Sequence, residues 1–87
     1  MTITFIGAGN LATRLGLALK NKGYKFLQVY SRTIESAGLL AEKLDCEPVN
    51  TAESISGKAD LYICALKDDI LEEVLGKTGL KNCLLVH

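Results

Sequence analysis

A glycine-rich turn near the amino terminus most constrains what this chain folds into. The apolar run at 2–6 leads into Gly7, Gly9 and Ala12, and leucines at helical spacing follow. This order of strand, turn and helix matches the pattern G-x-G-x-x-G/A. There the first glycine permits a tight turn, the second lets the backbone approach a pyrophosphate, and the last small residue lets the helix pack closely on the strand. The pattern therefore predicts a turn that holds the diphosphate of a nucleotide cofactor.

The start of the helix after this turn suits an anion, because free N–H groups and the positive end of the helix dipole converge there. The motif needs the backbone of Asn10 more than its side chain, which can instead satisfy the helix N-terminus. Glycines also mark ordinary turns, so a purely structural strand-to-helix connection remains the alternative.

Strand and helix patterns alternate along the rest of the chain. The first helix ends at Gly23, and Thr33 is the expected N-cap of a second helix, Ile34 to Asp45, with Ile34 on its inward face. This alternation predicts an α/β fold, a doubly wound parallel sheet of about five strands that is Rossmann-like, with right-handed crossovers. The expected strands are 2–6, 24–30, 48–49, 61–66 and 83–86, with short helices at 51–55 and from Asp68 or Asp69 through Leu75.

Composition limits the classes of function. The 87 residues are 48% apolar, which suits one small domain over residues 1–87. Ten basic and ten acidic residues balance, so neither nucleic acid nor an anionic membrane is an expected partner. Without a membrane-length apolar run or a signal peptide, we expect a cytoplasmic protein. The three cysteines lack metal-site or C-x-x-C spacing, so no metal is expected and inert core thiols are the preferred interpretation.

The last expected strand ends beside the end of the sequence. A strand at the sheet margin with no following helix leaves apolar surface and unpaired backbone exposed. We therefore expect either that this chain is the front part of a longer protein or that a partner covers that edge.

The end of the second expected strand carries Ser31, Arg32 and Thr33 where NAD-preferring domains have an acidic residue that binds the ribose hydroxyls. A carboxylate there would repel a 2′-phosphate, whereas the guanidinium of Arg32 can pair with it and the two hydroxyls can add donors. These residues favour NADP over NAD. The alternative is that the hydroxyls cap the second helix and Arg32 is a solvated charge.

Three segments carry a resemblance to a known family: IGAGNLATRL, VYSRT and ADLYICALKDDIL. Together they resemble the N-terminal Rossmann-like domain of an uncharacterised NADP-dependent oxidoreductase-like family. That family is similar to pyrroline-5-carboxylate reductases, deazaflavin-dependent NADP reductases and the wider β-hydroxyacid dehydrogenase clan. The resemblance covers essentially the whole chain. It implies a downstream helical domain, absent from this sequence, that forms a homodimer and closes the active site.

The resemblance also implies where the cofactor lies. It places the pyrophosphate over Gly9, Asn10 and Leu11 and the adenosine phosphate near Ser31, Arg32 and Thr33. The nicotinamide-side ribose would lie against Ala65 and Leu66. Lys67, the next residue in the same loop, is a further candidate for this contact. The cofactor-binding set expected from motif and resemblance is Gly7, Gly9, Asn10, Leu11, Ala12, Ser31, Arg32, Thr33, Ala65 and Leu66.

No residue has the pattern of a catalytic group. Asp68 and Asp69 are adjacent residues typical of a helix start, and His87 is a lone terminal histidine without an orienting partner. We therefore predict the cofactor domain of an NADP-dependent oxidoreductase for a small carbonyl or imine substrate, inactive alone. The alternative is a non-enzymatic redox sensor. A methyltransferase is disfavoured because it too usually needs an acid near the second strand.

Overall fold

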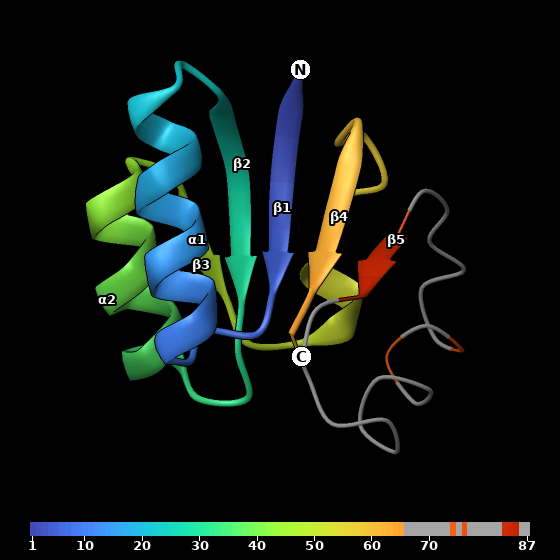
Figure 1. The fold of residues 1–87 in the computed structure, drawn as a ribbon. Coiled ribbons are helices and arrows are strands. Elements are labelled where there is room, and N and C mark those ends of the chain that lie inside the picture. The colour runs from blue at the N-terminus through green and yellow to red at the C-terminus, as the bar shows by residue number, and fades with distance from the viewer. Residues whose placement is uncertain (66–73, 75, 77–82, 86–87) are drawn as a thin grey trace.

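A parallel five-stranded sheet forms the centre of the computed structural model, which describes residues 1–65, 74, 76 and 83–85 (Figure 1). The strand order is β3-β2-β1-β4-β5, and every pair is parallel. The predicted Rossmann-like α/β fold is thereby confirmed. The strands are β1 (Thr2–Ile6), β2 (Lys25–Tyr30), β3 (Glu47–Val49), β4 (Leu61–Cys64) and β5 (Cys83–Leu85), and the helices are α1 (Asn10–Asn21), α2 (Ile34–Leu44) and the short 3-10 helix η1 (Ala52–Ser54).

The helix boundaries follow from backbone conformation. Gly23, just after α1, has φ 93°, a left-handed value that glycine adopts at little cost, as the sequence predicted. The second helix ends one residue earlier than expected, because Asp45 is the left-handed C-cap with φ 57°. The expected helix start at Asp68 or Asp69 lies outside the described residues.

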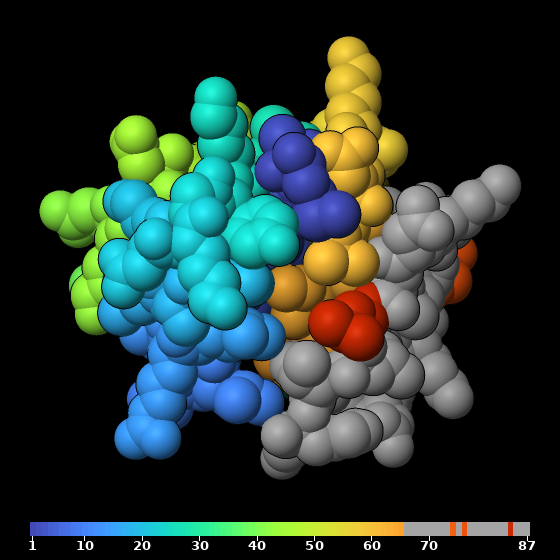
Figure 2. All heavy atoms as spheres, turned by 45° about the horizontal axis from the view of Figure 1, so that its top comes forward, coloured from blue at the N-terminus to red at the C-terminus, as the bar shows by residue number. Residues whose placement is uncertain are grey.

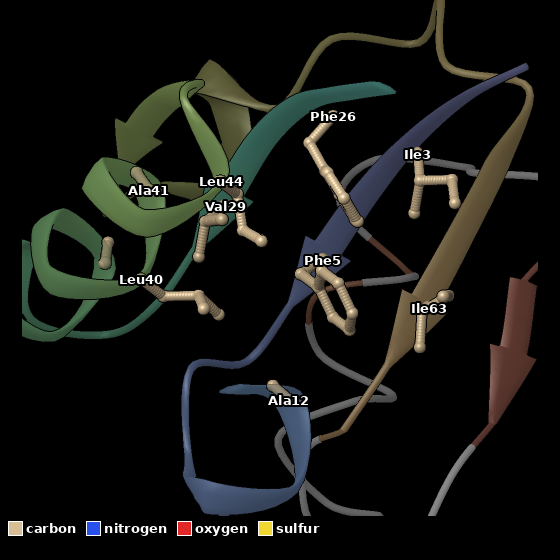
Figure 3. Packing of buried hydrophobic residues seen from close by; sticks show 10 residues of the cluster. Ile3, Phe5, Ala12, Phe26, Val29, Leu40, Ala41, Leu44 and Ile63 are labelled. Atoms are coloured by element: carbon tan, nitrogen blue, oxygen red, sulfur yellow. The ribbon is translucent and has the colours of Figure 1, made fainter. Parts of the chain in front are cut away.

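One face of the sheet packs against α1 and α2. Phe5 of β1 and Ile63 of β4 contact this layer, and Leu40 of α2 and Ala12 of α1 are buried in it (Figure 3). Ala12 has no exposed surface, which agrees with the close helix packing that the motif predicts. The expected inward position of Ile34 is wrong: its side chain is 43% exposed, because it begins α2 beyond the end of β2.

The opposite face holds a second buried cluster that includes Tyr30, Tyr62 and Cys64. A polar contact fixes the connection between β3 and β4 here. The amide of Gln28 donates to Glu47 Oε1 at 2.7 Å, and the Ser56 N–H donates to Gln28 Oε1 at 2.7 Å. Each face of the sheet therefore carries a buried cluster, as a doubly wound fold requires.

Candidate functional site

The carboxyl ends of three neighbouring strands meet at one edge of the sheet. Gly7, Ser31 and Ala65 each follow directly after β1, β2 and β4, respectively. The Gly7 N–H donates to the Tyr30 carbonyl at 2.7 Å, and the Ala65 N–H donates to the Ile6 carbonyl at 2.8 Å. These backbone bonds hold the glycine turn, the Ser31 segment and the Ala65 segment side by side, as the sequence analysis expected of the candidate residues.

This edge is also where the strand order reverses. From β1 the chain builds outward to β2 and β3, and then returns to place β4 on the other side of β1. Open α/β sheets bind ligands outside the carboxyl ends of the strands at such a point. The glycine turn lies at that point, at the bottom of the sheet in Figure 1.

The two glycines of the turn differ in backbone conformation and in their surroundings. Gly7 is buried and has φ 116°, so the fold itself favours a residue without a Cβ there. Gly9 has φ −82°, which any residue adopts, and a Cβ added to it would meet no atom within 4 Å. The described protein thus gives no reason for a glycine at position 9. A diphosphate held against its backbone would give one.

The start of α1 is open to an anion. Gly9 is the N-cap, no side chain makes a cap hydrogen bond, and the first turn has no acidic residue. The exposed Asn10 side chain therefore does not cap this helix. Thr13 bonds backward, its N–H and hydroxyl both donating to the Gly9 carbonyl at 3.0 Å. The backbone here fits a diphosphate, because its N–H groups and the helix dipole converge at a helix start that no described side chain caps.

Thr13 is a site residue that the sequence analysis did not name. Its two bonds to one carbonyl fix the orientation of the Gly9 peptide at the mouth of α1. A hydroxyl residue four positions after the second glycine was the signal, since Thr side chains commonly bond the carbonyl one helical turn earlier.

The segment after β2 carries no carboxylate. Ser31 is half-buried, and Arg32 and Thr33 are exposed. Thr33 is the N-cap of α2 by position, as predicted, but its hydroxyl donates to Ser36 Oγ at 2.9 Å and makes no cap bond. Within the described part of the chain, no ion pair engages the Arg32 guanidinium. Arg32 thus follows the strand next to the glycine turn, and no described carboxylate pairs with its guanidinium.

Other candidates are limited to what the structure describes. Ala65 is half-buried at the carboxyl edge, whereas Leu66 and the remaining expected neighbours (Lys67, Asp68, Asp69 and His87) lie outside the described residues.

Among the residues that are placed, no group of three His, Cys, Asp or Glu side chains could hold a metal ion. Burial, with a smaller effect of the neighbouring Asp45 charge, raises the pKa of Cys46 to about 11, so this thiol is a poor nucleophile at neutral pH.

No helix in the described ranges combines the length and the apolar character that a bilayer span requires.

Comparison with known proteins agrees with the fold. The family described as "NADP oxidoreductase coenzyme F420-dependent" matches residues 2–86. A "putative NADP oxidoreductase" from Bacteroides fragilis is 45% identical, with a TM-score of 0.87 over 99% of this chain and 35% of that chain. The search of curated proteins found no match.

More distant structures share the fold. Arogenate dehydrogenase from Synechocystis is 17% identical, with a TM-score of 0.77 over 98% of this chain and 31% of that chain. A protein of Thermotoga maritima is 24% identical, with a TM-score of 0.65 over 98% of this chain and 31% of that chain. The present chain thus spans about a third of the length of these solved structures. The chain belongs to the NADP oxidoreductase, coenzyme F420-dependent family and is a Rossmann-like, NAD(P)-binding domain of oxidoreductase type.

Proposed function

We propose that this chain binds NADP across the carboxyl edge of β1, β2 and β4 and serves as the cofactor domain of an NADP-dependent oxidoreductase. One observation carries the proposal: Gly9 is a glycine that neither backbone conformation nor packing of the described protein requires, and it lies at an uncapped helix start. The family description names both NADP and coenzyme F420, so the choice of NADP is our own inference from Arg32.

The glycine turn supplies backbone donors in this proposal. Asn10, Leu11 and Ala12 form the first turn of α1 and offer N–H groups to the diphosphate, and Gly9 leaves room for it. Gly7 sets the turn, and Thr13 keeps the Gly9 peptide in place. Ala12 contributes by packing, because its burial lets α1 start close to the sheet.

Arg32 selects the phosphorylated cofactor. Its guanidinium follows β2, the strand next to the glycine turn, and no carboxylate in the Ser31–Thr33 segment would repel a 2′-phosphate. The hydroxyls of Ser31 and Thr33 add donors to the same phosphate. Ala65 and Leu66 line the nicotinamide-side ribose beyond β4.

The nicotinamide supplies hydride chemistry when bound, and the described residues bind and orient the cofactor. The sequence pattern of a catalytic group is absent from them. We propose that substrate contacts and the proton donor come from polypeptide beyond residues 1–87, in a homodimer that reduces a small carbonyl or imine. The isolated chain is then inactive and binds cofactor weakly. No finding favours the alternative of a redox sensor.

Titration calorimetry of the 87-residue chain with NADPH and NADH tests the phosphate assignment. We expect NADPH to bind at least about tenfold more tightly, equivalent to about 1.4 kcal/mol. Replacing Arg32 (Arg32→Ala) should remove most of that preference and leave the NADH affinity nearly unchanged. Lys25→Ala is the matched control, because Lys25 is an exposed cation at the opposite end of the same strand.

Equal affinities for the two cofactors, or an Arg32→Ala chain that keeps its NADPH preference, would contradict the assignment. A loss of preference in Lys25→Ala would point to general charge attraction instead of a phosphate site.

A further inference from the structure

An apolar groove lies on the α1 side of the sheet, away from the glycine turn. It has a volume of about 300 Å³ and runs between α1 and the strands β4 and β5. In Figure 2 the orange atoms of β4 lie between the blue atoms of α1 and the red atoms of β5. The lining includes Leu15, Leu19, Tyr24, Leu61, Ile63 and Leu84.

Topology explains why α1 and α2 do not cover the groove. The two helices that cover this face, α1 and α2, lie over β1, β2 and β3, the half of the sheet built first. The connections that lead to β4 and β5 contribute Ala52, Ile55 and Val74 to the cluster on the opposite face. Right-handed crossovers to any further parallel strand beyond β5 would also run on that opposite face. The described parts of the connections to β4 and β5 therefore lie on the face opposite the groove.

The two edges of the sheet differ in chemistry. At one edge β3 contains Glu47 and Pro48, a charge and a proline that discourage contact with another chain. At the other edge β5 consists of Cys83, Leu84 and Leu85, and the Leu84 side chain is 49% exposed beside the groove. The β5 strand itself thus carries neither the charge nor the proline that β3 has.

We propose that the groove is the docking surface for an amphipathic helix from polypeptide outside residues 1–87. The Bacteroides relative, 45% identical, has about two thirds of its length beyond the part that this chain matches, and so has polypeptide available for the cover. The described side chains that line the groove are apolar, so the docking face is a stripe of Leu, Ile or Met at helical spacing.

The size of the groove favours a helix over a second copy of the chain. A helix beside α1 would lie 8–10 Å from it at the usual packing distance and would insert a few apolar side chains between Leu19 and Leu84. A stable homodimer buries about 800 Å² and about 20–30 residues on each partner, whereas eight described residues line the groove.

Docking at the groove is independent of cofactor binding. Tyr24 precedes β2 and Leu61 begins β4, so the groove extends toward the amino ends of the strands, whereas the glycine turn follows the carboxyl end of β1. Failure of either proposal would therefore leave the other intact.

Carbene footprinting tests the docking directly. The 87-residue chain is compared with a chimera in which it replaces the matched third of the Bacteroides protein. We expect Tyr24 and Leu84 to be labelled in the isolated chain and protected in the chimera. Leu39, which is 67% exposed on α2 outside the groove, is the internal control and should be labelled equally in both. The full-length Bacteroides protein, footprinted at the aligned positions, gives the same test without a chimera.

A pair of variants adds an energetic readout. Leu84→Glu should lower the Tm of the chimera by at least about 5 °C more than it lowers the Tm of the isolated chain, whereas Leu39→Glu should affect both alike. Equal shifts for Leu84→Glu, or labelling of Leu84 in both the chimera and the Bacteroides protein, would overturn the proposal. An isolated chain that sediments as a dimer with Leu84 protected would overturn it in favour of a second copy.

Discussion

At the scale of single residues, one buried polar atom among the described residues has no hydrogen-bond partner. Thr4 lies in the middle strand with no exposed surface, and its Oγ1 has no hydrogen-bond partner among the described residues. A buried hydroxyl that has lost water without gaining a partner costs roughly 1–3 kcal/mol. Sequence alone does not reveal this, because the β-branched shape of threonine suits a strand whether or not its hydroxyl is satisfied.

We therefore expect Thr4→Val to stabilise the protein. Valine keeps the shape and removes the unpaired oxygen, so the free energy of unfolding should rise by about 1 kcal/mol. Urea denaturation followed by circular dichroism measures the change. Thr4→Ser is the control, since it keeps the hydroxyl and should be less stable than the natural chain. A destabilised Thr4→Val would mean that the hydroxyl has a partner after all.

At the scale of elements, α1 approaches Leu44 of α2 and Phe5 of β1 closely at Gly16. A Cβ at this position would lie 3.1 Å from Leu44 Cδ1 and 3.2 Å from Phe5 Cε2. The sequence analysis placed the close contact at Ala12, which is buried, but did not single out Gly16. The contact at Gly16 depends on Leu44 of another helix, which no local pattern reveals.

Two glycine-to-alanine changes test this contact. Gly38 lies in α2 with no atom within 4 Å of its missing Cβ, so Gly38→Ala should stabilise the chain by about 1 kcal/mol through helix propensity. Gly16→Ala gains the same propensity but overpacks the interface, so it should be less stable than Gly38→Ala by about 1–3 kcal/mol. Thermal unfolding of both variants measures this difference in stability. Equal stability would show that the side chains around Gly16 shift to accept the added methyl group at no cost.

A carboxylate joins the starts of β1 and β4. The Thr2 N–H donates to Asp60 Oδ2 at 2.8 Å, and this bond is the main cause that lowers the pKa of Asp60 from 3.8. A second bond from the Thr2 hydroxyl, at 3.3 Å, acts in the same direction, while partial desolvation opposes both. The resulting contribution to stability is present above the unfolded-state pKa and is lost as pH falls through the lower folded-state pKa.

Comparing the chain with Asp60→Asn between pH 6 and pH 2 measures this contribution. Asparagine keeps an acceptor but no charge, so the stability difference should be greatest above about pH 4 and should shrink at lower pH. A difference that stays constant over this range would show that Asp60 acts through shape alone.

At the scale of the whole molecule, local patterns predicted the order of the elements. The positive φ of Gly7 and Gly23 and the cap position of Thr33 follow from rules that act within a few residues. The exposure of Ile34 was predicted wrongly, because helical spacing does not say how far a helix extends beyond the sheet. The irregularity between Ile3 and Thr4 in the pairing with β2 was not anticipated, since it depends on register with another strand.

The candidate site was predictable for a related reason. Its members sit directly after strands, and parallel strands bring their carboxyl ends to one edge, so strand assignment also placed the residues together. The sequence did not reveal that a Cβ at Gly9 would meet no atom within 4 Å, or that the Thr13 hydroxyl donates to the Gly9 carbonyl. Both depend on the exact path of the backbone.

The most direct test of the account is Gly9→Ala, because the described protein leaves room for the added methyl group and a bound diphosphate would not. The free energy of unfolding should change by less than about 1 kcal/mol, while NADPH affinity in calorimetry should fall at least about tenfold. A variant that folds equally well and binds NADPH as tightly as the natural chain would contradict the account.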